Sequence, residues 1–178
     1  MDDPAAFMQE LEGVEQIKDD FLSAMGKLAA TVSIVTTSSA GERSGLTATA
    51  LCSAKVEPPS MLICVTKTAG THAMITQSKR YCVNMLQTEQ VEVARTFAGM
   101  TGHIGEERFT HAGVWSTVDD LPVLTGALSS IRCAVSQALD IGTHTIFVGQ
   151  VHGILTNPGA EPLLYADKTF SRLVPLGD

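Results

Sequence analysis

The sequence predicts a mainly β protein, folded as an antiparallel barrel with short helical excursions. Short apolar and β-branched runs recur along the chain and are bounded by residues that favour turns, which is the pattern of strands in a sheet. These runs do not alternate regularly with helices, which disfavours a doubly wound parallel sheet. We expect about seven strands and three short helices.

Composition limits the class of protein. The chain has 178 residues and is 44% hydrophobic, enough for one domain with its own core. Its net charge is −7, and it has no block of lysine or arginine, so a nucleic-acid surface is not expected. It has no apolar run long enough to span a membrane. The acidic N-terminus lacks a signal-peptide pattern, so we expect a cytoplasmic protein with a tail over 1–16 and one domain over 17–178.

The cysteines argue against a metal site. The four residues are Cys52, Cys64, Cys82 and Cys133. None forms a C-x-x-C pair and all lie in apolar, strand-like runs, so zinc is not expected. We predict buried free thiols, which suit a reducing compartment.

The first half of the predicted barrel begins after a helix. That helix is expected over 17–29, where apolar residues recur at helical spacing. The β-branched run 31–37 and the alternating run 45–54 are predicted to form a hairpin around a Ser- and Gly-rich turn. A continuously apolar strand is predicted over 60–66, after two prolines, and both of its faces must be covered.

The central part mixes helices and strands. We predict a short helix over 71–78 with Thr71 as its cap, a strand over 80–86 and a helix over 89–97. The segment 99–113 contains four glycines and two histidines and is predicted to be a mobile loop.

The C-terminal part returns to strands. Two long strands are predicted over 126–137 and 145–155, joined by a turn that contains Gly142. A loop over 158–162 leads to a last strand over 163–165, which is expected to complete the sheet.

The run 45–54 is the most informative segment for function. One face is expected to carry small apolar residues that can pack, namely Leu46, Ala48, Ala50, Cys52 and Ala54. The opposite face carries Thr47, Thr49, Leu51 and Ser53. Its hydroxyl groups and free N–H groups suit a phosphate or a polyol chain, although an ordinary half-buried strand has the same composition. The pattern alone leaves both interpretations open.

Motifs for conventional catalysis are missing. The sequence contains no G-x-G-x-x-G, no Walker A loop, no G-x-S-x-G elbow and no helical pair of histidines at metal-binding spacing. If the protein is an enzyme, a cofactor is therefore expected to carry the chemistry.

An ordered set of segments nevertheless resembles the flavin reductase-like family. The matching pieces are FLSAMGKLAATVSIVTT, GLTATALCSAKVEPPSMLICV, SKRYCVNML, TFAGM, Arg108-Phe109, LPVLTGALSSIRC, GTHTIFVGQV and PLLY. The resemblance implies a split β-barrel of Greek-key type that works as a homodimer and binds FMN or FAD. It also implies hydride transfer from NADH or NADPH to that flavin. The reduced flavin would go to a partner monooxygenase, and the most similar subgroup serves aromatic-ring and pyrimidine-degrading monooxygenases.

The resemblance also implies roles for individual residues. The isoalloxazine and ribityl chain would be lined by Thr47, Ala48, Thr49, Ala50 and Leu51. Ser53 and Ala54 would meet the phosphate. Further flavin contacts would come from Thr68, Ala69, Gly70, Thr71, His72 and Phe97. His144 would lie beside the nicotinamide as the catalytic residue, and Tyr165, a further cofactor-binding residue, would close the other side. The turn 41–44 would approach the nicotinamide nucleotide. Ser44 stands where family members often carry histidine, and Arg43 is the obvious candidate for a 2′-phosphate.

Alternative interpretations remain for the chain and for these residues. The same barrel also occurs in proteins that hold flavin or haem without turning it over, and in pyridoxamine-phosphate-oxidase-like enzymes. His144 could instead cap a turn at the start of its strand. Asn84 could orient the flavin loop or be a strand asparagine satisfied by backbone. Phe109 and Trp115 are interpreted as lid or core residues.

Overall fold

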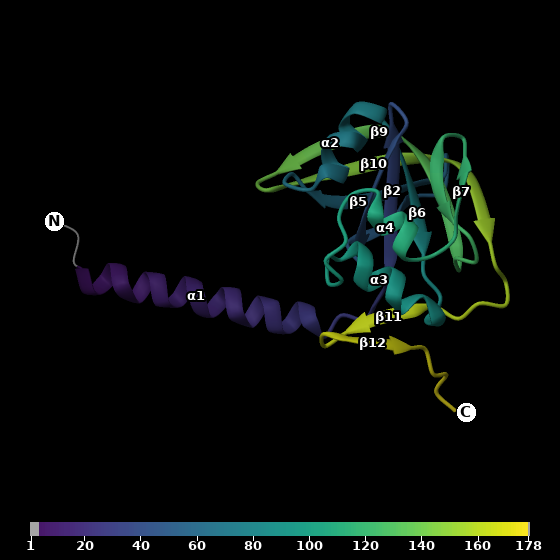
Figure 1. Ribbon diagram of the computed structural model, residues 1–178. Helices are drawn as coiled ribbons and strands as arrows, with labels where there is room; N and C mark the ends of the chain where they lie inside the picture. The colour runs from purple at the N-terminus through teal and green to yellow at the C-terminus, as the bar shows by residue number, and fades with distance from the viewer. Residues whose placement is uncertain (1–3, 178) are drawn as a thin grey trace.

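The computed structural model describes residues 4–177 and confirms a mainly β protein with short helices (Figure 1). The helices are α1 (Pro4–Gly26), α2 (Gly70–Ser78), α3 (Val91–Phe97) and α4 (Glu107–His111), with a 3₁₀ turn at Thr88–Gln90. The strands are β1 (Ala30–Thr31), β2 (Ser33–Ser39), β3 (Glu42–Ala48), β4 (Leu51–Lys55), β5 (Ser60–Thr66), β6 (Arg80–Met85), β7 (Trp115–Val118), β8 (Leu121–Leu124), β9 (Ser129–Ile141), β10 (His144–Thr156), β11 (Leu163–Ala166) and β12 (Thr169–Arg172).

The main sheet has seven antiparallel strands in the order β3-β2-β6-β9-β10-β5-β4. Its two edge strands, β3 and β4, are consecutive in the chain and are separated only by Thr49 and Ala50. The sheet must therefore curl until its edges meet at these two residues. Among the described strands, β3 pairs only with β2 and β4 only with β5, so no ladder joins the two edges. The predicted barrel is thus not closed by hydrogen bonds, which corrects that part of the sequence prediction.

The predicted strand 45–54 is therefore two strands at opposite edges of the sheet. The break at Thr49–Ala50 shifts the alternation, so Leu51 packs on the same core cluster as Leu46 and Ala48. Cys52 and the residues that follow it in β4 are exposed. The predicted faces hold for the residues before the break and are wrong after it.

Three strands were missed because of their turns. β7 and β8 form a hairpin across Asp119 and Asp120, whose φ angles are 51° and 60°. β11 and β12 turn through Asp167 and Lys168, which also have positive φ. Hairpin turns of this kind usually contain Asn-Gly or Asp-Gly, so Asp-Asp and Asp-Lys give little signal in the sequence.

Two core clusters lie on opposite faces of the central strands. Ile34 belongs to the cluster that contains Phe97 and Phe109, whereas its neighbour Val35 packs with Ile63 and Phe147 on the other face. A strand that contributes to both clusters needs apolar or small residues at every position, which explains the β-branched run over 34–37 in β2 and the serines around it.

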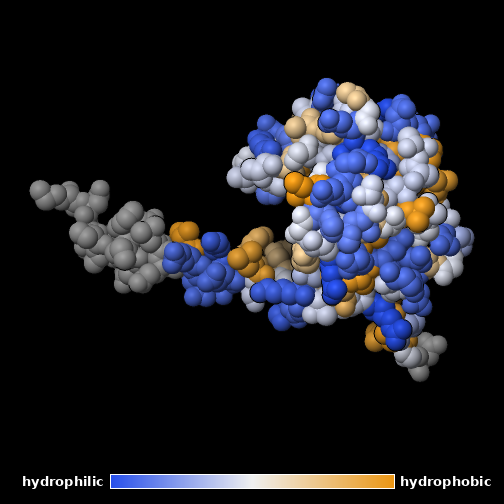
Figure 2. All heavy atoms as spheres, viewed as in Figure 1, coloured by the Kyte–Doolittle hydropathy of each residue, from blue (hydrophilic) through white to orange (hydrophobic). Residues whose placement is uncertain are grey.

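The helix α1 projects from the body instead of packing along it (Figure 1). It begins at Pro4, so most of the predicted tail over 1–16 is helical and the predicted helix over 17–29 ends at Gly26. Apolar side chains on its described part are exposed, including Ile17 at 70% and Phe21 at 62%. Figure 2 shows orange patches along the coloured part of the helix. None of the helices in the described residues is long and apolar enough to cross a membrane.

The four cysteines are free, but they are not all buried. Cys82 and Cys133 are buried and Cys64 is half-buried, whereas Cys52 is exposed on β4. The prediction of buried thiols is therefore wrong for Cys52, because the strand break turns that side chain outward. Burial raises the pKa of Cys82 to about 12 and that of Cys133 to about 11.

Candidate cofactor cleft

A cleft of about 500 Å³ lies between β3, the start of α2 and the segment that follows α3. Its volume falls within the range of about 300–1,000 Å³ that is usual for small-molecule sites. The cleft is lined by Ser44, Gly45, Leu46, Thr47, Thr66, Ala69, Gly70, Thr71, Phe97, Ala98, Gly105 and Arg108. Five of the sequence-predicted flavin contacts are among them: Thr47, Ala69, Gly70, Thr71 and Phe97.

Two hydroxyl contacts position the walls of this cleft. Thr47 donates its hydroxyl to the backbone carbonyl of Ala94 at 2.7 Å, which fixes β3 against α3. Thr71 is not the predicted cap of α2, because the helix begins at Gly70 and Ala69 is its N-cap. Instead, the Thr71 hydroxyl lies 2.8 Å from that of Ser44, so it joins α2 to β3.

Gly45 allows the aromatic wall to approach the strand. A Cβ built on Gly45 would lie 2.8 Å from Cε1 of Phe97, closer than real contacts permit. The missing side chain therefore lets the buried Phe97 ring sit directly beside β3. A strand glycine often marks such a close approach.

Several predicted contacts lie outside the cleft. Ala48 and Leu51 pack on the core, whereas Thr49, Ala50, Ser53 and Ala54 are exposed at the break and along β4. Thr68 is exposed and lies at the cleft margin, with its hydroxyl 3.1 Å from that of Thr66. The structure therefore gathers part of the predicted set in one cleft and leaves the β4 residues on an open edge.

His72 faces the protein interior and not the cleft. Its ring packs on Phe147, with centroids 5.3 Å apart, and its Nε2 lies 2.8 Å from the hydroxyl of Thr145. Thr145 in turn donates to a carboxylate oxygen of Asp140 at 2.7 Å. Because the hydroxyl proton goes to Asp140, His72 Nε2–H must donate to Thr145. The hydrogen bond from Thr145, followed by that from Lys67, lowers the pKa of Asp140.

His144 is exposed at the start of β10. Its Nδ1 lies 2.9 Å from the hydroxyl of Thr143, and it stands opposite Thr66 of β5 in the sheet register. Because Thr66 lines the cleft, His144 occupies the strand beside the cleft margin without lining the cleft itself.

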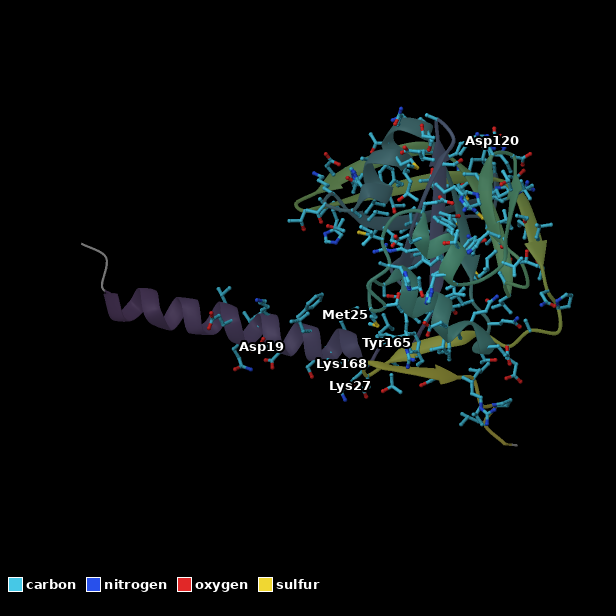
Figure 3. All side chains as sticks on the ribbon, viewed as in Figure 1. Asp19, Met25, Lys27, Asp120, Tyr165 and Lys168 are labelled. Atoms are coloured by element: carbon cyan, nitrogen blue, oxygen red, sulfur yellow. The ribbon has the colours of Figure 1, made fainter. Side chains whose placement is uncertain are left out.

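Tyr165 lies away from the cleft. Its ring packs on Phe170, with centroids 5.2 Å apart, and it borders the core cluster of Phe97. Figure 3 places Tyr165 where α1 joins the body, at the opposite end from Asp120.

The segment after α3 supplies the residues that sequence reasoning missed, Ala98, Gly105 and Arg108. The glycine-rich composition of 99–113 signalled a loop, and α4 interrupts it. Arg43 on β3 pairs with Glu106 of this loop and stacks over Phe109 at 4.5 Å. The loop is therefore held against β3.

Other singled-out residues are structural. Asn84 is fully buried, and its side chain joins four strands through bonds to Ile34, Thr36, Leu124 and Ser130. This confirms the interpretation of a satisfied strand asparagine. Phe109 and Trp115 pack with Phe97 in the core. Among the side chains of residues 14–177, no three His, Cys, Asp or Glu residues form a group that could hold a metal ion.

A curled antiparallel sheet with a cleft of this size, lined by small, aromatic and hydroxyl side chains and no carboxylate, is the architecture of a small-molecule-binding β protein. The chain belongs to the flavin reductase like domain family, whose model matches residues 25–173.

Named relatives agree with this assignment. The chain is 37% identical over 158 residues to "FMN reductase (NADH) RutF" of Stutzerimonas stutzeri, covering 88% of this chain and 89% of that protein. It is also 37% identical to the "4-hydroxyphenylacetate 3-monooxygenase reductase component" of Salmonella dublin, over 88% of this chain and 92% of that protein. A solved structure of the NADH:FAD oxidoreductase SgcE6 of Streptomyces globisporus, in complex with NAD and FAD fragments, has a TM-score of 0.82 at 29% identity and covers 90% of this chain and 95% of that one.

Proposed function

We propose that this protein is an NAD(P)H:flavin oxidoreductase that transfers hydride to FMN or FAD and supplies the reduced flavin to a partner monooxygenase. The observation that carries the proposal is the cleft between β3, α2 and the loop after α3, in a chain of the flavin reductase like family. The names of RutF and of the SgcE6 structure support flavin and NADH as ligands, and the relative named as a monooxygenase reductase component supports a partner monooxygenase.

The residues of the cleft fit a flavin. The walls combine an aromatic ring, Phe97, with small side chains and hydroxyls, and no carboxylate is among the lining residues. Because Gly45 has no side chain, the Phe97 ring lies directly against β3 and forms the aromatic wall. A bound flavin supplies the hydride-accepting chemistry. The chain must hold two rings in contact at about 3–3.5 Å and exclude water between them.

Individual residues would divide this work. Ser44 and Thr71 fix the distance between β3 and α2, and Thr47 fixes β3 to α3. Backbone N–H groups of the β3 edge are suited to stabilising negative charge on a reduced ring. His144 is the proposed nicotinamide contact, beside the cleft margin at Thr66. Arg43 is already paired with Glu106, which favours NADH over NADPH as the donor.

The oligomeric state, barrel type and location are further parts of the proposal. We infer a homodimer because α1 projects with its apolar side chains exposed, and a second copy would cover them. A split β-barrel of Greek-key type is supported by the curled sheet whose edges meet at Thr49–Ala50. Within the dimer, the predicted contacts on exposed β4, such as Ser53, would complete a flavin site. The proposed location is the cytoplasm.

The test is loss of NADH absorbance under anaerobic conditions, with and without added FMN or FAD. We expect NADH to be consumed only when flavin is present, and a titration of FMN against FAD to give the preference. Flavin binding without NADH consumption would instead support a non-catalytic flavin-binding protein. Oxygen-dependent turnover of pyridoxamine phosphate would instead support a pyridoxamine-phosphate-oxidase-like enzyme.

A further inference from the structure

The cleft contains one charged side chain among its lining residues, that of Arg108. Its Nε donates to the carbonyl of His103 at 3.0 Å and its Nη1 to the carbonyl of Gly45 at 3.4 Å. These two carbonyls, one from its own loop and one from β3, bind the guanidinium at two of its nitrogens and hold it in place. In the described structure Nη2 has no protein acceptor, and it lies 3.6 Å from where a Cβ on Gly99 would be.

Arg108 also lacks a counter-charge, although acidic residues are its neighbours in sequence. Glu106 is engaged by Arg43, and Glu107 accepts the backbone N–H of Ile104 at 3.4 Å. Among residues 14–177, whose side chains the structure describes, no carboxylate forms an ion pair with Arg108, whereas Arg43, Arg80 and Arg132 each have one. Glu106 therefore pairs with Arg43 and not with Arg108.

A fixed, uncompensated guanidinium in a cleft without carboxylates is a site for an anion. We propose that Arg108 recognises a phosphate group of a ligand bound in this cleft, through the Nη2 atom that the carbonyls of His103 and Gly45 leave free. Arginine suits this role because its planar fork presents charged N–H donors in fixed directions, and both hydrogens of Nη2 are free for phosphate oxygens. The phosphate belongs either to the flavin or to the dinucleotide. The inference rests on the proposed function, because that function places phosphorylated ligands in the cleft.

The experiment compares ligands with and without phosphate in direct binding. Arg108→Gln removes the charge, Arg108→Lys keeps the charge and loses the fork, and Arg95→Gln is the matched control. Arg95 is exposed on α3, outside the cleft, with its guanidinium 5.8 Å from the Phe170 ring. Kd values for FMN and riboflavin are measured by flavin fluorescence, and the Kd for ADP-ribose by calorimetry. The urea midpoint of each variant checks folding.

If the phosphate belongs to the flavin, Arg108→Gln should raise the Kd for FMN by about tenfold to a hundredfold and leave that for riboflavin unchanged. If the phosphate belongs to the dinucleotide, Arg108→Gln should raise the Kd for ADP-ribose by the same factor and leave the Kd for FMN unchanged. Arg108→Lys should lie between the wild type and Arg108→Gln, and Arg95→Gln should match the wild type.

Two results would overturn the inference. One is a folded Arg108→Gln variant whose Kd values for FMN and ADP-ribose equal those of Arg95→Gln. The other is an equal loss of FMN and riboflavin, which would place Arg108 at the ring instead of a phosphate. Failure of the proposed function is distinguishable, because the wild type itself would then neither bind flavin nor consume NADH.

Discussion

The hydroxyl oxygens of Ser44 and Thr71 lie 2.8 Å apart, which joins strand β3 to the first turn of helix α2 at the wall of the cleft. Thr71 is 2% exposed, so its hydroxyl depends on this partner. The pair connects residues 27 positions apart in the chain, and no local pattern in the sequence indicates it.

Thr71→Val keeps the side-chain volume but removes this hydrogen bond. We expect the free energy of unfolding to fall by about 0.5–1.5 kcal/mol, measured by urea denaturation. In a double-mutant cycle with Ser44→Ala, the second substitution should cost less once the first is present. Strictly additive losses would show that the two hydroxyls are not coupled.

Asn84→Leu should be far more costly. The substitution would leave the Leu124 N–H and the Ser130 hydroxyl without the acceptor that they now reach at 2.9 and 2.8 Å. Each buried, unsatisfied group costs about 1–3 kcal/mol, so we expect a loss on the order of 3 kcal/mol in urea denaturation. Asn157→Ala, at a half-buried loop position, is the control and should stay within about 0.5 kcal/mol of wild type. A loss under about 1 kcal/mol for Asn84→Leu would contradict this assignment.

His144→Ala separates the two proposed ligands. The imidazole is exposed beside Thr66, so its removal should leave flavin affinity nearly intact. A single lost hydrogen bond of about 0.5–1.5 kcal/mol predicts a rise in the KM for NADH, or a slower hydride transfer, on the order of tenfold. Rapid-mixing kinetics with flavin prebound measure both. Loss of flavin with normal hydride transfer at saturating flavin would instead assign His144 to the flavin pocket.

The exposed side chains of α1 predict a self-association surface. Phe21→Glu places a charge among the apolar residues that a second copy would cover, and Phe21 is 62% exposed in the single chain. We expect the wild type to be a dimer at micromolar concentration by light scattering and Phe21→Glu to shift it toward monomer. Gln16→Glu adds the same charge beside Asp20, with which Gln16 is hydrogen-bonded, and should remain dimeric. A monomeric wild type would remove the basis for a flavin site shared between subunits.

The four thiols should differ in reactivity. Cys52 is exposed, whereas burial closes access to Cys82 and Cys133 and raises the pKa of their thiols to about 12 and 11. Because the thiolate is the reactive form, labelling with Ellman's reagent at pH 8 should show a fast phase from Cys52. Cys52→Ala should abolish that phase, while Cys82 and Cys133 react only after unfolding. A fast phase that survives in Cys52→Ala would show that another thiol is accessible.

The sequence predicted the strands with strong local signals. The runs that became β2, β5, β6, β9 and β10 are apolar or β-branched, because the sheet buries them. Prediction from the sequence failed where the local pattern of a strand or turn was weak, or where the structure depends on contacts between distant residues. The Asp-Asp and Asp-Lys turns concealed β7, β8 and β12. The extent of α1 was missed because its described apolar residues, such as Ile17 and Phe21, are largely exposed and do not belong to the core.

What the sequence determined by itself was the class of the protein: a mainly β fold, a flavin-type resemblance, and the apolar and hydroxyl residues of β3 and α2. Only the tertiary structure decided which of them form a cleft. Thr49 and Ala50 break a run that alternates without interruption in the sequence, and β4 thereby moves to the opposite edge of the sheet. Arg108 enters the site from 63 residues away, through a hydrogen bond to Gly45. Local periodicity specifies backbone conformation, whereas contacts between distant residues depend on how the sheet curls.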